Sequence, residues 1–251
     1  MQQFILGMRV DATTYKDALH KVLTWAQRGE SRYVCVANVH MVMEAYDAPS
    51  FRALVNRADL VTPDGMPLVW MLRLLGMKEQ ERVYGPTLTL RIAEAAAQNG
   101  VPVGFYGGRP EVLHQLIENL QARYPRLQVV YAYSPPFRPL TAKEDALVVE
   151  EINASGARIL FVGLGCPKQE RWMAAHKGKV HAVMLGVGAA FDFHAGRLPQ
   201  APPWMQRAGL EWLFRFLVEP RRLWRRYLKH NPRFIILAMM QLFRYWRYGE
   251  G

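Results

Sequence analysis

Short apolar runs and helical patterns alternate along most of this chain, and this alternation constrains the fold more than any single residue does. The apolar runs are rich in β-branched residues, which is typical of buried strands, and they lie at residues 33–36, 60–62, 101–106, 127–131, 159–162 and 183–187. Helical patterns opened by Thr or Pro lie at residues 14–28, 86–99, 110–124 and 141–155. Such alternation predicts an α/β fold with a mostly parallel sheet and helices on both faces.

The sequence changes in character near residue 198. Prolines within residues 199–203 predict a linker, and a basic, aromatic-rich segment follows it. Pro220 and Pro232 are expected to divide that segment into short helices. We therefore expect an α/β domain over residues 1–198 that carries the functional site, and a C-terminal helical appendage over residues 199–251.

The net positive charge of the chain limits the kinds of molecule it is expected to bind. The net charge of +11 and the pI near 9.9 favour nucleic acid, anionic lipid or phosphorylated substrates. Residues 204–247 hold ten Lys and Arg against two Glu, a surplus of eight, so the charge belongs largely to the appendage. Cys35 and Cys166 are not spaced as a zinc or redox pair, and the N-terminus lacks a secretory signal pattern. A reducing cytoplasm is therefore expected.

Loops that follow the predicted strands hold the candidate binding residues, because ligands bind beyond the carboxyl ends of parallel strands. In residues 163–170 a strand runs through glycines into a helix with Pro167 in its first turn, and the free backbone N–H groups would suit a diphosphate. A tight turn without any ligand explains the same string equally well. Neither this string nor residues 186–191 matches the dinucleotide fingerprint, because Lys168 and Phe191 replace its third glycine.

Asp64 lies between Pro63 and Gly65 at a predicted strand end, from which its carboxylate can point into a cleft. With an ordinary pKa near ~4 it would be ionised at neutral pH and able to accept a proton from a substrate hydroxyl. An Asp that only closes its own turn is the alternative, because Pro-Asp-Gly is a common turn string. His40 and His194 are expected to be structural histidines, and no metal site is predicted.

Seven strings, in their order and spacing, resemble the WecG/TagA/CpsF glycosyltransferases, glycosyltransferase family 26. They are VANVHMV, TPDGMPLVW, ERVYGP, FVGLGCPKQE, GVGAAFDFHAG, APPWMQRAGLEWLFRFLVEPRRLWRRY and KHNPRF. The resemblance implies a Rossmann-like fold and an inverting, metal-independent enzyme of surface-polymer synthesis. It implies that N-acetylmannosamine or its uronic acid passes from a UDP-sugar to undecaprenyl-diphosphate-linked N-acetylglucosamine.

The resemblance also implies roles for individual residues. Asp64 corresponds to the family's proposed general base. Substrate binding is implied for Asn38, Arg82, Gly165, Lys168, Gln169, Gly188 and Asp192, and acceptor or diphosphate binding for Arg215, Arg222 and Arg225. Two positions depart from the family's pattern, because Val36 replaces its usual Thr and Thr87 its usual Asp. No cofactor is implied.

Two other interpretations stay open at the level of the sequence. The first is the same fold acting with another UDP-hexose. The second is a non-enzymatic nucleic-acid-binding protein, which would explain the high pI because arginine and aromatic residues are interleaved near the C-terminus. No named nucleic-acid motif is present, so nucleic acid is not expected as a partner. A homo-oligomer is compatible with the sequence.

The appendage is predicted to lie on the inner face of the cytoplasmic membrane. Its longest apolar stretch, residues 234–240, falls far short of the ~20 residues that span a bilayer. The basic and aromatic residues around that stretch suit an anionic membrane surface. The alternative is that these helices only pack on the α/β domain and that their arginines are solvated.

Overall fold

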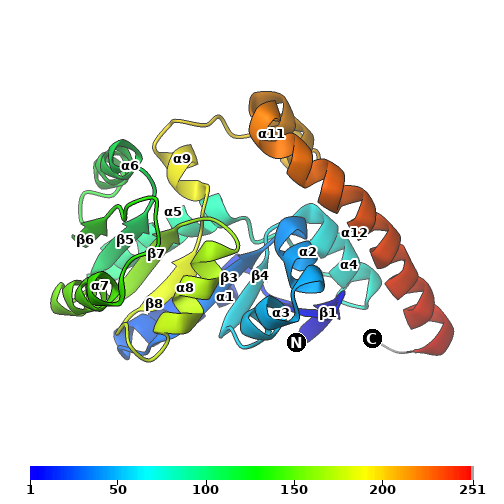
Figure 1. Ribbon diagram of the computed structural model, residues 1–251, viewed down its shortest axis with the longest axis horizontal. Coiled ribbons are helices and arrows are strands. Elements are labelled where there is room, and N and C mark those ends of the chain that lie inside the picture. Colours follow the sequence, from blue (N-terminus) through cyan, green and yellow to red (C-terminus); the bar gives the residue numbers. More distant parts are fainter. Residues whose placement is uncertain (250–251) are drawn as a thin grey trace.

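A six-stranded parallel sheet forms the centre of the computed structural model, which describes residues 1–249 (Figure 1). The strands are β3 (Arg32–Ala37), β4 (Leu60–Pro63), β5 (Val103–Gly107), β6 (Val129–Tyr133), β7 (Ile159–Gly163) and β8 (Val183–Gly186). They lie in the order β4-β3-β8-β7-β5-β6, and every neighbouring pair is parallel. The predicted α/β fold is confirmed, and each predicted strand is present.

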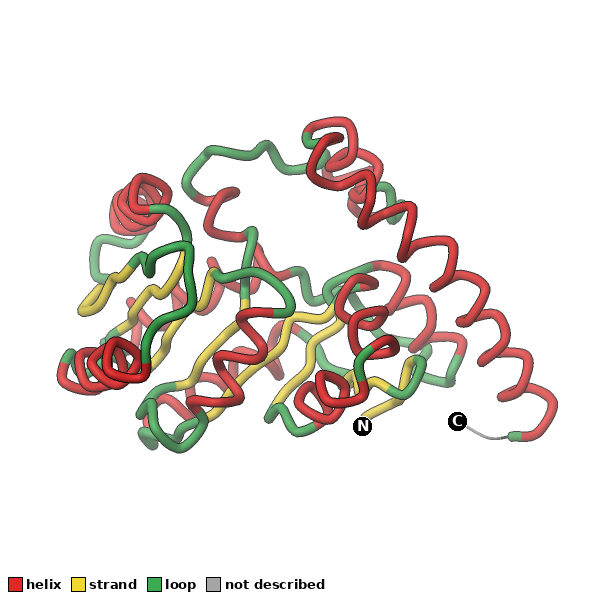
Figure 2. The backbone as a smooth tube through the Cα atoms, in the orientation of Figure 1, coloured by secondary structure: helices red, strands yellow, loops and turns green. Residues whose placement is uncertain are grey.

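Helices cover both faces of the sheet, as Figure 2 shows. One hydrophobic layer holds α1 (Tyr15–Gln27), α5 (Gly85–Asn99), α6 (Pro110–Arg123) and α9 (Ala190–His194). The other holds α2 (Val39–Asp47), α3 (Pro49–Asn56), α4 (Met66–Leu74), α7 (Ala142–Ala154) and α8 (Lys168–His176). Alternate residues of β7 serve the two layers, with Ile159 and Phe161 in the first and Leu160 and Val162 in the second. Burial on both faces explains why the strands other than the edge strand β6 read as continuous apolar runs.

Helix starts follow the predicted capping signals. The Thr14 hydroxyl accepts a hydrogen bond from the Asp17 backbone N–H and the Asp17 carboxylate accepts one in return, which makes a capping box at α1. Thr141 and Glu144 form the same arrangement at α7. The sequence therefore fixes where these helices begin by local chemistry alone.

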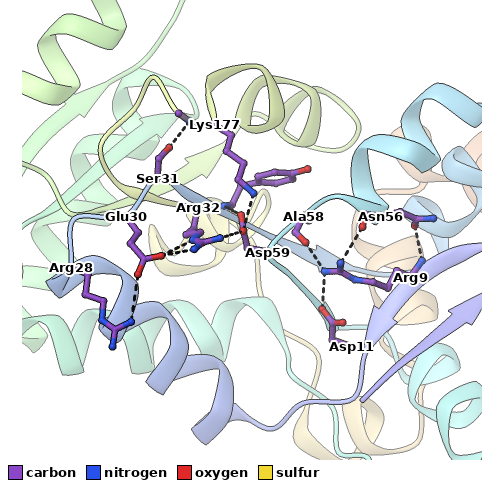
Figure 3. A network of polar contacts seen from close by, with 12 residues as sticks. Arg9, Asp11, Arg28, Glu30, Ser31, Arg32, Asn56, Ala58, Asp59 and Lys177 are labelled. Carbon is purple, nitrogen blue, oxygen red and sulfur yellow. Dashed lines mark hydrogen bonds and ion pairs between the residues drawn. The ribbon is translucent and has the colours of Figure 1, made fainter.

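An N-terminal hairpin, β1 (Gln2–Ile5) with β2 (Met8–Asp11), was not among the predicted elements. It is fastened to the sheet by polar contacts (Figure 3). The Arg9 guanidinium donates to the backbone carbonyls of Asn56 and Ala58 at 3.0 and 2.6 Å, and it pairs with Asp11. The Asp11 carboxylate in turn accepts the Val61 N–H of β4 at 2.7 Å. The hairpin thus braces the strand that leads to Asp64.

The appendage consists of α10 (Pro203–Arg207), α11 (Glu211–Val218) and α12 (Pro220–Tyr248). Pro220 begins a helix as expected, but the predicted division at Pro232 is wrong, because Pro232 lies inside the 29-residue α12. Its missing N–H removes one helical hydrogen bond. Packing keeps the helix continuous, since Phe234, Ala238 and Leu242 belong to the main core beside α2.

An ion pair also joins α12 to helix α2 of the α/β domain. The Arg233 guanidinium of α12 makes two hydrogen bonds to the Asp47 carboxylate, at 2.6 and 2.9 Å. The last two residues of the predicted appendage lie outside the described residues. Within residues 1–249, no helix combines the length and the apolar character that crossing a membrane requires.

Candidate active site

The carboxyl ends of β3 and β4 bring Asn38 and Asp64 together. Asn38 follows β3 and caps α2, where its side-chain oxygen accepts the Met41 N–H at 3.2 Å. Asp64 follows β4, and its backbone N–H donates to the Ala37 carbonyl at 2.8 Å. Both residues line one cavity of about 860 Å³, which we call the Asp64 cavity. Its volume lies near the upper end of the roughly 300–1,000 Å³ typical of ligand pockets.

The Asp64 side chain bonds to a distant residue and not to its own turn. One carboxylate oxygen accepts the Gly85 N–H at 2.8 Å, and the Arg82 guanidinium lies 3.8 Å away. Burial raises the pKa of Asp64 to about 6, against the opposing effect of Arg82. The alternative of an Asp that closes its own turn is therefore not supported by these contacts. A carboxyl group that titrates near neutral pH is suited to general-base catalysis.

Arg82 joins Asp64 to the appendage. Its guanidinium donates to the Asp64 backbone carbonyl and to the Glu211 carboxylate of α11, the latter at 2.6 Å. It also stands over the Tyr84 ring, 4.0 Å from the centroid. Sequence reasoning missed Glu211, although it lies inside one of the quoted strings. The appendage therefore forms part of the wall around Asp64.

The predicted arginines of the appendage have different positions. Arg215 lines the Asp64 cavity, and so does Arg226, which was not predicted. Each has a buried Nε without a hydrogen-bond partner within the described chain. Arg222 instead bonds to Glu219 at 2.8 Å, and Arg225 stands over the Trp224 ring; neither lines the cavity. Two arginines that line one cavity are the chemistry that binds an anionic group such as a diphosphate.

A second group of predicted residues lies in the loops after β7 and β8. Gln169 is 4% exposed, and its side-chain oxygen accepts the Gly165 N–H at 3.1 Å. A Cβ added at Gly186 or Gly188 would lie 3.0 or 3.3 Å from the Gln169 amide, so these glycines leave room for it. The two loops therefore close around one amide group.

Other predicted residues of these loops sit at their margins. Lys168 is exposed and begins α8, so Pro167 is the residue before the helix and not part of its first turn. Asp192 is half-buried on the short helix α9. Neither lines the Asp64 cavity, and Gly165, Gln169 and Gly188 do not line it either. The predicted residues thus fall into two neighbouring groups, one after β3 and β4 and one after β7 and β8.

Glu170 is a buried acid that sequence reasoning missed. It has no exposed surface, and one carboxylate oxygen accepts the Gln169 amide N–H at 2.8 Å while the other has no partner within residues 1–249. Burial raises the pKa of Glu170 to about 7. Its contact orients the Gln169 amide, which leaves the amide oxygen facing the Gly165 N–H.

One cluster among the described residues could hold a metal ion. The Glu44 carboxylate lies 3.9 Å from His40 Nδ1 and 3.7 Å from His230 Nε2, which joins α2 to α12. Burial lowers the pKa of His40 to about 3, so its ring is neutral.

The two histidines that were expected to be structural differ in their contacts. His40 Nδ1 is buried and has no hydrogen-bond partner within the described residues, so His40 is not the satisfied structural histidine that was expected. His194 Nε2 lies 2.9 Å from the Pro86 carbonyl oxygen, as expected for a structural histidine.

Comparison with known proteins identifies the family. The family model of the glycosyl transferase WecG/TagA/CpsF family matches residues 3–248. The chain belongs to this family. It is 30% identical to the N-acetylglucosaminyldiphosphoundecaprenol N-acetyl-beta-D-mannosaminyltransferase of Bacillus spizizenii. The alignment runs over 231 residues and covers 92% of this chain and 87% of that relative.

Membership of the WecG/TagA/CpsF family makes this chain a glycosyltransferase, and more closely a hexosyltransferase. It sets aside the non-enzymatic nucleic-acid-binding interpretation. The arrangement around Asp64 combines a carboxyl group that titrates near neutral pH, arginine side chains and a cavity large enough for a ligand.

Proposed function

We propose that this glycosyltransferase moves N-acetylmannosamine from UDP to N-acetylglucosaminyl-diphospho-undecaprenol, with inversion at the anomeric carbon. The activity for which the Bacillus spizizenii relative is named supports this acceptor and this sugar. The observation that carries the proposal is the position of Asp64, whose side chain is 17% exposed, in a cavity that also holds Arg215 and Arg226. A base and two cationic groups in one cavity fit a reaction between two diphosphate-bearing molecules.

The proposed reaction is a single displacement. The acceptor hydroxyl oxygen bonds to the anomeric carbon while Asp64 takes the hydroxyl proton. The bond from that carbon to the diphosphate oxygen breaks, and UDP leaves with the electron pair. Preorganised donors must meet the charge that grows on the diphosphate. We assign this role to Arg82 and to the backbone N–H groups of Cys166 and Lys168, because Pro167 has no N–H and those of Gly165 and Gln169 already donate within the loop.

The acceptor's own diphosphate is assigned to arginines of the appendage. The cationic side chains of Arg215 and Arg226 line the cavity. Arg222 and Arg225 lie outside it, and we propose that they meet the diphosphate or lipid headgroups where the cavity opens. The appendage, over residues 199–251, would then attach the enzyme to the inner face of the cytoplasmic membrane.

A donor panel tests the proposal. The purified protein is incubated with UDP-N-acetylmannosamine, its uronic acid and other UDP-hexoses, each with a short-chain N-acetylglucosaminyl diphosphate lipid. Product mass is expected to show N-acetylmannosamine added to the acceptor. Transfer of a different hexose would change the assigned donor, and the absence of transfer from every donor would refute the proposed reaction.

Activity is expected to survive an excess of EDTA. The proposed mechanism meets the diphosphate charge with arginines and backbone N–H groups, so no step requires a divalent ion. The initial rate with and without chelator measures this. Loss of activity that Mg²⁺ or Mn²⁺ restores would contradict the mechanism, and restoration by Zn²⁺ alone would direct attention to His40, Glu44 and His230.

Replacing Gln169 by Ala is expected to lower kcat/KM about tenfold, because the Gly165 N–H and the Glu170 carboxylate both lose a buried partner. The matched control is Gln115→Ala, since Gln115 lies on the surface of α6 and bonds only to Asn119 of the same helix. A melting temperature for each variant separates local from global effects. Unaltered rate and unaltered UDP-sugar binding in Gln169→Ala would reduce this loop to a structural turn.

A further inference from the structure

The Asp64 cavity extends well beyond the polar residues around Asp64. It continues between α4 and α12, which lie side by side in Figure 1. The α4–α12 groove, as we call this part, is lined by Met66, Trp70 and Leu74 of α4 and by Ile235, Met239 and Leu242 of α12. The spacing of these residues is that of one helix face on each side, so two apolar stripes face a shared space.

The groove leads away from the catalytic carboxyl group. Helix α4 begins directly after Gly65, and its far end meets α12 where the Tyr245 hydroxyl lies 3.5 Å from the Leu75 carbonyl. From Met66 to Leu74 the stripe is about 12 Å long, at the helical rise of ~1.5 Å per residue. The polar end of the cavity and its apolar end are therefore arranged one after the other.

Large apolar side chains of the groove are open to solvent. Trp70 is 42% exposed, Leu74 47% and Met239 65%. Clustered exposed apolar side chains mark a site that binds an apolar partner. The arginines at the other end of the cavity, Arg215 and Arg226, complement an anionic group. The combined shape and charge fit one molecule that carries a diphosphate followed by a hydrocarbon chain.

We propose that the α4–α12 groove binds the first isoprene units of the acceptor lipid, those next to its diphosphate. This inference rests on the proposed function, since it takes a polyprenyl diphosphate sugar as the acceptor. The groove selects acceptors that carry a chain, and it holds the sugar end of the acceptor against Asp64. Leu74 and Met239 are specificity residues in this scheme, because they touch the chain and not the reacting atoms.

Kinetics with two acceptors tests the groove. Both acceptors carry N-acetylglucosamine on a diphosphate, one with a single isoprene unit and one with four, in solution without vesicles or detergent. The double variant Leu74→Ser/Met239→Ser is expected to lower the preference for the longer chain, taken as the ratio of the two kcat/KM values, about tenfold. The control is Leu147→Ser, since Leu147 on α7 is 48% exposed and does not line the cavity. It should leave the preference unchanged.

A second measurement locates the chain directly. A four-unit acceptor with a photoreactive group on its first isoprene unit is irradiated with the unaltered protein, and the labelled peptides are identified by mass spectrometry. Label on residues 66–74 or 235–242 supports the groove, and label confined to other elements overturns it. Equal kcat/KM for the two acceptors in the unaltered protein, or an equal loss on both acceptors in the double variant, also overturns it. If neither acceptor is turned over, the proposed function fails, and the labelling still decides where the chain binds.

Discussion

Replacing Asp64 by Asn is expected to lower turnover by about 10²–10⁴-fold, the usual contribution of a positioned general base. Asn keeps the size of the side chain and can still accept the Gly85 N–H, but it cannot take a proton from the acceptor hydroxyl. Arg82 keeps its partner Glu211, so no buried charge loses all its contacts. Steady-state kinetics gives the turnover, and calorimetry should show UDP-sugar binding little changed. Near-normal turnover would remove Asp64 from the mechanism.

The same substitution has an expected effect on stability. The pKa of Asp64 is about 6 in the folded chain against 3.8 for a free Asp, so the folded state binds more protons between these values. The free energy of unfolding therefore falls as pH rises from about 4 to about 6, by up to about 3 kcal/mol. Asp64→Asn lacks this loss and should melt at a higher temperature than the unaltered protein at pH 7, with no difference below pH 4.

Activity of the unaltered protein should follow the same ionisation. Because the base must be a carboxylate, kcat/KM is expected to fall about tenfold per pH unit below about pH 6. A rate that is constant down to pH 5 would contradict the assigned base.

The second large effect is expected on membrane binding, when exposed apolar residues of α12 are replaced. Four residues on its outer side, Ile236, Met240, Phe243 and Trp246, are each at least 49% exposed. Replacing all four by Ser should abolish binding to anionic vesicles, because shallow insertion of such side chains supplements the attraction of basic residues, each worth roughly 1 kcal/mol near the surface. In a flotation assay the unaltered protein should rise with the vesicles and be released by high salt, whereas the variant should stay in the dense fraction.

This design keeps the whole chain for a structural reason. Deleting the appendage would strip Phe234, Ala238 and Leu242 from the main core, so a failure to float would have two explanations. Phe137→Ser is the control, because Phe137 is 89% exposed in a loop after β6, remote in sequence from the appendage. Flotation of the fourfold variant at the level of the unaltered protein would refute the membrane role of this face.

Local patterns predicted the sheet well. The strands are short and apolar, and all of them except the edge strand β6 are largely buried, so each apolar run stands out from the amphipathic helices around it. The N-terminal hairpin was not predicted, because contacts of Arg9 and Asp11 hold its two four-residue strands in place and the partners of these residues lie far along the chain. The prediction of a helix boundary at Pro232 was wrong, because burial of Phe234 and its neighbours outweighs one missing helical hydrogen bond.

The candidate site was predictable where strand ends define it and not where tertiary contacts do. Asp64 stands out because a Pro-Asp-Gly string ends an apolar run. The ion pair between Arg82 and Glu211 joins residues 129 positions apart, so no local sequence pattern predicts it. Arg226 is one of several neighbouring basic residues, and the sequence does not distinguish it from Arg225. The two residues differ only in the structure, where α12 places Arg226 at the cavity wall and Arg225 away from it.

The position of β3 has a consequence for the order of synthesis. This strand lies between β4, which follows it closely in the chain, and β8, whose Val183 pairs with Arg32. On the ribosome the first strands of the sheet are therefore made long before one of their neighbours, and α12, which completes the core, is made after every strand of the sheet. Pairing between such distant segments is slow, and the early strands stay exposed to aggregation while they wait. A chain that stops before α12 would thus have a complete sheet and an incomplete core.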